Sequence, residues 1–580
     1  MIDNPLVASI ANKGKKRKDN LHFEAIQDYW TCLVSREASI LARKEVLTGK
    51  AKFGIVGDGK ELPQVAMARA FKKGDWRSGY YRDQTFMFAL ELATVEDFFA
   101  QLYADANNDP FSGGRQMNSH YATAMFDDQG NWLPQKDLYN VSSDISSTAG
   151  QMPRAVGLAL ASKKYRESKK LSSSTGFSDK GNEICFVTIG DASTSEGVFW
   201  EAINASGVLQ VPMAVSIWDD GYGISVPTKY QTTKGNIGAV LEGFRTDNRG
   251  QGYDIYTIEG WDYVALREAY EKGIEKTRNN HTPCIFHVRE LTQPQGHSTS
   301  GSHERYKSKE RLEWERERDC VKRFKEWILL KGYATEKDLE EMTTEARAFV
   351  KTARNNAWEA YTNPVNTALE NLINIYDKLA DETQNRELVN QHKNHIAKAI
   401  SPPISELVAN AKKVLYATVG EDNAARKELV SWVETKMSEG NNRYEKFLFS
   451  ESPKSALRVP IVQAEYGDDA PTKNGYQILN ECFKYNLKKR PEVFAFGEDV
   501  GYIGDVNQGF AGLQELFGEE RVFDTGIREL TIMGQAIGMA MRGLRPIAEI
   551  QYLDYLIYGC LLYTSPSPRD QRGSRMPSSA

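Results

Sequence analysis

The chain has 580 residues, of which 41% are hydrophobic and 26% charged, and its formal net charge is −5. This is an ordinary globular composition, and the length suits several domains of about 150 residues each. The nearly balanced charge argues against a broad cationic surface for nucleic acid, and no run of about 18 apolar residues predicts a membrane span. The six cysteines lack metal-ligand spacing and the N-terminus lacks an apolar secretory core, so we expect a cytoplasmic protein with reduced thiols.

Residues 184–218 predict two buried strands joined by a helix. The apolar run 184–189 is rich in β-branched and aromatic residues and leads directly into Gly190-Asp191. Residues 196–209 carry apolar side chains at helical spacing, and 213–218 form a second apolar run. Because parallel strands need such a crossover, the pattern predicts a βαβ unit.

Each of these strands is followed by acidic residues. Asp191 follows the first strand and Asp220 the second, and open α/β sheets bind ligands outside the carboxyl ends of their strands. Mg²⁺ prefers oxygen ligands, and backbone amides beside the carboxylates suit a diphosphate. The sequence therefore predicts a metal and diphosphate site. The alternative is that 219–221 is only a turn, because Asp and Gly favour turns.

A second module is predicted after residue 450. Residues 335–450 are polar and helical in character, and 452–471 form a turn-rich connector. A helix over 475–487 and a strand over 493–496 then lead into a second acidic turn at 497–500. The predicted fold class is α/β, with doubly wound, mostly parallel sheets, helices on both faces, a helical linker and an incomplete second α/β domain.

Residues 190–197 followed by 219–225 resemble the thiamine-diphosphate motif in the decarboxylating component of 2-oxo acid dehydrogenases. The resemblance implies a thiamine-diphosphate-binding fold with thiamine diphosphate and Mg²⁺ as cofactors. Asp191, Asp220 and the carbonyl of Tyr222 would bind the metal, and the cofactor would lie against Gly190, Ala192 and Ser193. Asp220 departs from the usual Asn, which adds a negative charge beside the diphosphate.

Three further segments extend the resemblance in the first half. Tyr81-Arg82 is similar to a pair whose Arg contacts the cofactor phosphates, a task that suits a guanidinium. The loop 296–300 resembles the active-site loop, in which His297 would sit near the diphosphate and help transfer the acyl group to the lipoyl arm; the alternative is a surface imidazole. Residues 146–153 align with the stretch whose backbone holds the aminopyrimidine, which implies contacts from Ser146, Thr148, Gly150 and Gln151.

Residues 523–530 resemble a beta-type segment of the same family, whose alpha-type and beta-type halves are often separate chains. There, a Glu bonds a ring nitrogen of the pyrimidine, which makes Glu529 the expected activator. A carboxyl group at that nitrogen favours the imino tautomer, which can remove the thiazolium proton. The alternative is that Glu529 is an exposed residue at a helix start.

The resemblance implies oxidative decarboxylation of a 2-oxo acid and acyl transfer to the lipoyl group of a dihydrolipoyl acyltransferase core. Residues 114–121 are similar to branched-chain relatives, so a branched-chain 2-oxo acid is favoured over pyruvate. Because alpha-type and beta-type domains of different protomers meet around each cofactor in the family, we expect a homodimer. The alternatives are a transketolase-like ketol transfer and a non-catalytic scaffold subunit of the complex.

Four segments are expected along the chain. They are an alpha-type domain over 1–350, a helical linker over 351–457, a partial beta-type domain over 458–559 and a non-native-looking tail over 560–580. The tail is rich in Ser, Pro and Arg and shows neither helix nor strand periodicity. The family continues further beyond Gly559, so we expect this sequence to lack part of the beta-type half and its activity to depend on the remainder.

Overall fold

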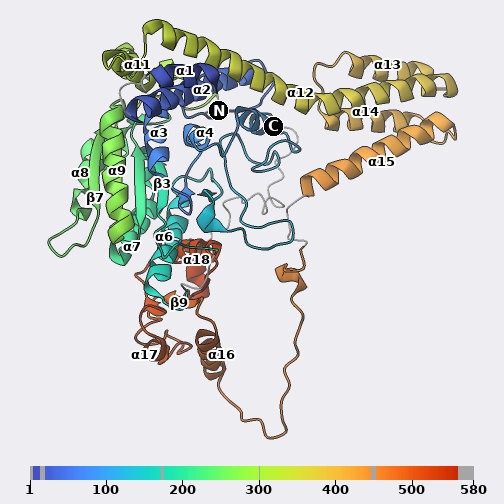
Figure 1. Ribbon diagram of the computed structural model, residues 1–580. Helices are drawn as coiled ribbons and strands as arrows, with labels where there is room; N and C mark the ends of the chain where they lie inside the picture. The colour runs from blue at the N-terminus through green and yellow to red at the C-terminus, as the bar shows by residue number, and fades with distance from the viewer. Residues whose placement is uncertain (1–3, 14–19, 172–175, 300, 446–451, 560–580) are drawn as a thin grey trace.

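The computed structural model describes residues 4–13, 20–171, 176–299, 301–445 and 452–559 (Figure 1). A body built around a parallel sheet carries a helical bundle that projects to one side, and residues 475–559 pack below the body. The tail expected at 560–580 lies outside the described residues.

The body contains a six-stranded, fully parallel sheet. Its strands, in spatial order, are β2 (Asn140–Val141), β1 (Trp76–Ser78), β3 (Cys185–Gly190), β4 (Met213–Trp218), β8 (Cys284–Arg289) and β7 (Asp254–Glu259). The predicted βαβ unit is confirmed, because β3 and β4 are neighbours joined by α7 (Gly197–Leu209). Gly190 pairs with Trp218, so the residues after both strands meet at one sheet edge.

Helices bury both faces of this sheet. Successive side chains of each strand point to opposite sides, so each strand contributes to two cores. Phe186 of β3 faces one apolar core, whereas its neighbour Val187 faces the other. The first core also takes side chains from α1 (Pro5–Lys13), α2 (Asn20–Leu47), α3 (Glu61–Ala70), α4 (Gln84–Ala89), α5 (Val95–Leu102), α9 (Tyr263–Asn280) and α11 (Cys320–Leu330). The second takes them from α6 (Gln151–Glu167), α7 and α8 (Ile237–Leu241).

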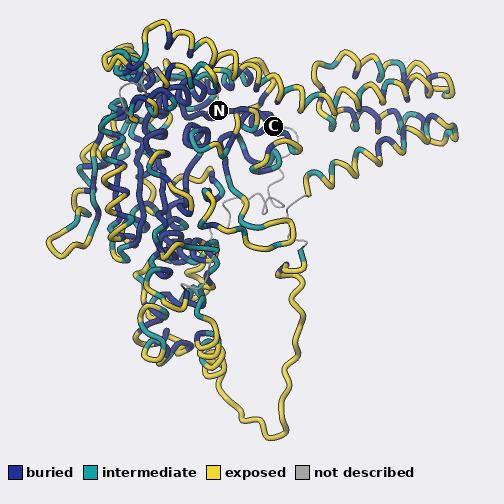
Figure 2. Tube along the Cα trace, viewed as in Figure 1, coloured by how far each residue is buried: buried dark blue, intermediate teal, exposed yellow. Residues whose placement is uncertain are grey.

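The long helix α12 (Glu336–Glu382) connects the body to the projecting bundle. It begins at a capping box of Thr335 and Asp338, and it crosses residue 350, the boundary expected between the alpha-type domain and the linker. Its first part packs on the body, whereas its last turns leave it. There they join α13 (Arg386–Ala397), α14 (Ile404–Ala417) and α15 (Ala424–Glu445) around an apolar core separate from that of the body (Figure 2).

Residues 475–559 form a smaller parallel sheet in the order β10 (Val522–Asp524), β9 (Val493–Gly497) and β11 (Arg545–Ala548). The predicted helix and strand are confirmed as α16 (Gly475–Lys489) and β9. Helices α17 (Leu513–Phe517) and α18 (Glu529–Met541) complete the described part. The extended segment 459–473 that precedes them is exposed throughout (Figure 2).

Helix α18 packs directly along α6, so the two halves share one apolar core. The contact is backbone-close because Gly157, Gly534 and Gly538 lie in it; a Cβ at Gly538 would stand 2.3 Å from the carbonyl oxygen of Arg154. At the far end, Arg542 donates to the carbonyl of Leu158 and pairs with Glu183. The contacts advance in the same direction along both helices, so α6 and α18 run side by side in parallel.

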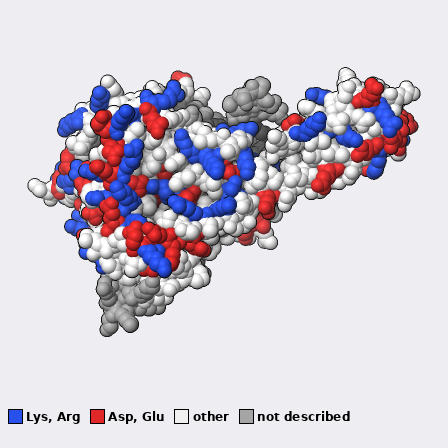
Figure 3. Space-filling model, turned by 90° about the horizontal axis from the view of Figure 1, so that it is seen from above, with Lys and Arg blue, Asp and Glu red and all other residues white. Residues whose placement is uncertain are grey.

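The surface mixes both signs of charge. On the face shown in Figure 3, basic and acidic side chains stand next to each other on the body and on the projecting bundle. Among the described helices, none has the length and apolar character needed to cross a bilayer.

Candidate cofactor and metal site

The predicted carboxylates meet at the carboxyl edge of the six-stranded sheet. Asp191 is 3% exposed and Asp220 8% exposed. Burial raises the pKa of Asp191 well above its usual value, and the charges of Asp220 and Asp219 raise it further. This accumulation of buried negative charge is the arrangement that a bound cation would relieve.

Asp220 has a different environment because Lys60 is bonded to it. Nζ of Lys60 lies 2.7 Å from Oδ2 of Asp220, and both side chains are buried. Although burial acts in the opposite direction, Lys60 lowers the pKa of Asp220, so this carboxyl group is ionised. Lys60 was not found from the sequence; the only local signal was its place after the Gly57-Asp58-Gly59 turn.

The segment 219–221 is indeed a turn, and the turn itself directs the acids. Gly221 has φ +78°, and the side-chain oxygens of Asp219 and Asp220 accept the backbone N–H groups of Gly221 and Tyr222. Asp219 is further held by Nε2 of the buried His287 at 2.7 Å. The turn fixes the buried carboxylate of Asp220 at the sheet edge, and the metal and diphosphate site at this segment stays a prediction.

Arg82 and His297 come together beside these acids. The guanidinium Nη2 of Arg82 lies 3.0 Å from Nδ1 of His297 and donates to the carbonyl of the same residue at 2.9 Å. Since a guanidinium can only donate, Nδ1 must accept, and we assign the imidazole proton to Nε2. Burial and the charge of Arg82 lower the pKa of His297 to about 4, so the ring is neutral at physiological pH.

Two more cations border the turn at 219–222. Arg311 donates to the backbone carbonyl of Asp220 at 2.6 Å, and Lys307 pairs with Glu315 at 2.7 Å. Both cations lie over the aromatic ring of Tyr222, whose centroid is 5.3 Å from Lys307 Nζ and 5.2 Å from the guanidinium carbon of Arg311. Neither cation was recognised from the sequence, because both belong to a charged stretch that predicts only a solvated helix.

A cavity of about 360 Å³ opens beside these residues. It lies between the turn that bears Ile224 and the loop that bears His297, and Tyr306 closes part of it. Ser300, part of the predicted active-site loop, lies outside the described residues. The cavity offers a space beside the imidazole that is large enough for a small organic molecule.

The predicted aminopyrimidine stretch lies at the start of α6. Ser146, Thr148 and Gly150 precede or cap the helix, and Gln151 donates to the carbonyl of Thr188 on β3 at 2.8 Å. Nε2 of His120 lies 2.9 Å from the Ser146 hydroxyl, and Tyr81 stacks on the His120 ring. This stretch therefore stands at the same sheet edge as Asp191.

Glu529 is the first residue of α18 and is half-buried. Because α18 runs parallel to α6, its first residue lies at the end of the molecule where α6 begins. Thr531 confirms this placement with a bond of 2.9 Å to Glu201 on α7, the helix that follows Asp191. Within the described part of the chain, no hydrogen bond or ion pair joins Glu529 directly to Asp191, Asp220, Arg82 or His297.

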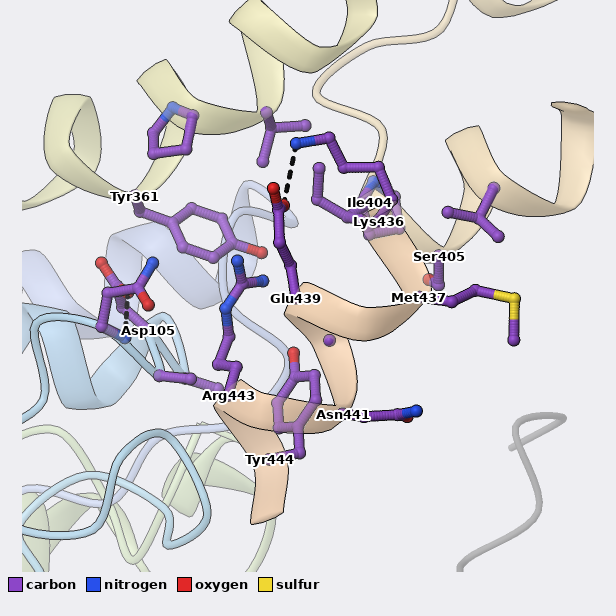
Figure 4. Close-up of a pocket in the computed structure, with 18 of the residues that line it drawn as sticks. Asp105, Tyr361, Ile404, Ser405, Lys436, Met437, Glu439, Asn441, Arg443 and Tyr444 are labelled. Atoms are coloured by element: carbon purple, nitrogen blue, oxygen red, sulfur yellow. Dashed lines mark hydrogen bonds and ion pairs between the residues drawn. The ribbon is translucent and has the colours of Figure 1, made fainter. Parts of the chain in front are cut away.

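A second cavity lies away from the sheet edge. It has a volume of about 1040 Å³ and opens where the base of the helical bundle meets the body (Figure 4). Arg443 and Tyr361 project into it, and Lys436 pairs with Glu439 at its rim. None of the predicted cofactor or metal residues lines this space, so it is distinct from the sheet-edge site.

Comparison with known proteins decides the family. The model of the dehydrogenase E1 component family matches residues 31–366, more than half of the chain. The chain belongs to the dehydrogenase E1 component family. A transketolase pyrimidine-binding domain matches residues 473–578 of this E1-family chain. The expected fold class and the fusion of alpha-type and beta-type halves are thereby confirmed, and the two matches together imply thiamine diphosphate.

Relatives match each half of the E1-family chain separately. The 2-oxoisovalerate dehydrogenase subunit alpha of Bacillus subtilis is 27% identical over 342 residues, which cover 58% of this chain and 91% of that subunit. The mitochondrial subunit alpha 1 of Arabidopsis thaliana is 24% identical over 343 residues, 58% of this chain and 63% of that subunit. The pyruvate dehydrogenase E1 component subunit beta of Acholeplasma laidlawii is 40% identical over 99 residues, 17% of this chain and 30% of that subunit.

The residues at the sheet edge suit a cation bound to a diphosphate. The two buried carboxylates offer oxygen ligands for a hard cation, while Lys60, bonded to Asp220, and Arg82, whose charge acts on Asp220, offer positive charge for phosphate oxygens. Among the described residues there is no group of three or more His, Cys, Asp or Glu side chains arranged to hold a metal by themselves. A diphosphate would therefore supply the missing oxygen ligands.

Proposed function

We propose that this chain is the decarboxylating component of a 2-oxo acid dehydrogenase complex and uses thiamine diphosphate with Mg²⁺. The observation that carries the proposal is the convergence of Asp191, Asp220, Arg82 and His297 at one buried sheet edge. The match to the E1 component family supports the same assignment.

Each residue has a distinct task in this proposal. Asp191, Asp220 and the Tyr222 carbonyl would hold Mg²⁺, while Arg82 would bind the diphosphate as a guanidinium clamp. Gly190, Ala192, Ser193 and Tyr81 would lie against the cofactor. The stretch 146–151 would contact its aminopyrimidine ring. When bound, thiamine diphosphate supplies the thiazolium that accepts the electron pair released on decarboxylation.

Glu529 and His297 would handle protons. Glu529 would hold a proton at a pyrimidine nitrogen, a role that suits a half-buried carboxyl group at the start of a helix. His297 is neutral and carries its proton on Nε2, so it can donate to a group that enters the adjacent cavity. That geometry supports a part in transferring the acyl group to a lipoyl sulfur.

The substrate we favour is a branched-chain 2-oxo acid. Two alpha-type relatives named 2-oxoisovalerate dehydrogenase support this choice, whereas the beta-type relatives carry the name pyruvate dehydrogenase and keep pyruvate in consideration. The partner would be the lipoyl-bearing dihydrolipoyl acyltransferase core. A homodimer and a cytoplasmic location are part of the same proposal and stay predictions.

The decisive experiment measures cofactor binding and CO₂ release together. The chain is titrated calorimetrically with thiamine diphosphate in Mg²⁺, then given 3-methyl-2-oxobutanoate or pyruvate with an artificial electron acceptor. Glu529→Gln should keep cofactor affinity within a few-fold but lower CO₂ release at least about 10²-fold, the scale of general acid-base catalysis. Glu481→Gln, an exposed glutamate on α16, is the matched control and should change neither.

The two alternatives give different results in the same assays. A transketolase-like enzyme would bind the cofactor and transfer a ketol group between sugar phosphates without releasing CO₂ from either 2-oxo acid. A scaffold subunit would bind the lipoyl-bearing core but not thiamine diphosphate. Cofactor-dependent CO₂ release that the Glu481 control retains and the Glu529 variant loses would exclude both.

A further inference from the structure

Lys60 is placed in the site by an unusually close backbone. A Cβ at Gly57 would stand 2.0 Å from the carbonyl oxygen of Arg82, and one at Gly59 would stand 2.1 Å from that of Thr292. Gly59 also has φ +81°, a conformation that glycine adopts without strain. The turn before α3 is therefore pressed against the two segments that carry Arg82 and His297, and Lys60 has little freedom to move.

The ammonium group of Lys60 is buried and makes its hydrogen bonds within this site. Its side chain is 1% exposed, and Nζ bonds Oδ2 of Asp220 at 2.7 Å and the carbonyl of Thr292 at 3.3 Å. The other carboxylate oxygen, Oδ1, accepts a longer bond of 3.2 Å from the Tyr222 N–H. One oxygen of Asp220 is thus tied to a cation while the other is held only by the turn.

The local charge explains why such a partner is needed. Asp191, Asp219 and Asp220 lie together at the sheet edge, and the diphosphate of the proposed function would add further negative charge. Like charges in a buried site repel strongly because little water screens them. A buried ammonium group on one of the carboxylates cancels its charge without removing its second oxygen.

We propose that Lys60 is a positioning residue of the metal and diphosphate site, which makes the Lys60–Asp220 pair act as a single neutral oxygen ligand. The inference rests on the proposed function and deepens it. It explains how an Asp can stand where an Asn is expected: the ion pair presents one oxygen and no net charge, as a carboxamide does. An Asp without Lys60, or Lys60 without the Asp, would leave a buried charge unpaired.

The test is a double-variant cycle on the whole chain. Lys60→Met, Asp220→Asn and the combined variant are compared with the parent by calorimetric titration with thiamine diphosphate in Mg²⁺ and by Mn²⁺ binding followed by electron paramagnetic resonance. Each single variant should weaken cofactor affinity at least about tenfold, because each leaves one buried charge without its partner. Contacting residues commonly show non-additive effects of this size. The combined variant, with an amide and no ammonium, should return to within about threefold of the parent.

A matched control lies at the opposite edge of the sheet. Asp75, buried before β1, pairs with Arg278 at 2.7 Å. Asp75→Asn and Arg278→Met break a comparable pair away from the site, so they should change thermal stability without changing Mn²⁺ or cofactor affinity. This control separates loss of a ligand from general loss of stability.

Each outcome has a definite meaning. Additive effects of the two site substitutions, or tighter Mn²⁺ binding by Lys60→Met, would overturn the inference, because Lys60 would then be a bystander or a competitor of the metal. If the parent itself bound neither Mn²⁺ nor thiamine diphosphate, the proposed function would fall and the inference with it. Normal parent binding with recovery in the combined variant would support both.

Discussion

Arg82 Nη2 lies 3.0 Å from His297 Nδ1, although 215 positions separate the two residues in the chain. The contact fixes the imidazole tautomer, because a guanidinium donates and cannot accept. It leaves the Nε2 proton free to face the adjacent cavity. Two chemical consequences of this pair can be measured.

The first concerns the chemistry of His297. His297→Gln should lower acyl transfer to a lipoyl domain by about 10²-fold or more, because the variant has no ring proton to transfer. Reduction of an artificial acceptor, which needs no lipoyl group, should fall much less. Equal losses in the two assays would contradict an acyl-transfer role. His281→Gln is the control, since that buried histidine contacts the carbonyl of Gly181 away from the site.

The second concerns the pKa of His297. Burial and Arg82 lower it to about 4, so Arg82→Met should raise the pKa while burial keeps it below the usual 6.5. NMR of ¹³C-labelled histidine from pH 4 to 8 measures the change. Arg249→Met, at an exposed arginine, should leave the titration unaltered. An unchanged His297 pKa in the Arg82 variant would show that the guanidinium does not act on the ring.

The raised pKa of Asp191 predicts that the stability of the cofactor-free protein depends on pH. Its folded-state pKa is raised above its unfolded value, so the native state holds more protons between the two pKa values and stability falls as pH rises through this window. Asp191→Asn should remove that fall and stabilise the chain at pH 8 by at least about 1.4 kcal/mol, the equivalent of one pKa unit. It should also abolish Mg²⁺-dependent cofactor binding.

Urea unfolding at pH 5 and pH 8 tests this prediction. Asp468→Asn, in the exposed segment 459–473, is the control and should leave both curves unchanged. A variant at Asp191 that is less stable than the parent at pH 8 would show that burying the Asp191 charge beside Asp220 and Asp219 does not cost the folded state stability.

The contact between α6 and α18 should be intolerant of any side chain at its glycines. Gly538→Ala places a Cβ 2.3 Å from the Arg154 carbonyl oxygen, so the backbones must separate at a cost of about 1 to 3 kcal/mol. Gly440→Ala in α15 meets nothing within 4 Å and should instead stabilise its helix by up to about 1 kcal/mol. Opposite shifts in thermal midpoint are expected; shifts of the same sign would contradict the close packing.

The projecting bundle should unfold independently of the cofactor site, because its apolar core is separate. Leu379→Ala removes a fully buried side chain and should destabilise the bundle by about 2 to 5 kcal/mol. Hydrogen exchange should then rise over 365–433 without a change in β3 or in cofactor affinity. Leu388→Ala, which is 37% exposed, is the milder control. Faster exchange in β3 would show that bundle and body unfold together.

The sequence by itself determined the elements around the site and the family. Apolar periodicity located β3, α7, β4 and β9 because it reflects which face of each element is buried, a local property. The acids after β3 and β4 could be placed at one edge because parallel strands end together. Residues 190–197 and 219–225 pointed to the family that the comparisons confirmed.

Only the tertiary structure decided which charges pair at that edge. Lys60 and Asp220 are 160 positions apart, and no local pattern links them. The same holds for the parallel packing of α18 on α6, where small residues matter because of what another helix places against them. Such contacts follow from the packing of whole elements rather than from spacing along the chain, which is why only the structure identifies Lys60, a lysine after a glycine turn, as the partner of Asp220.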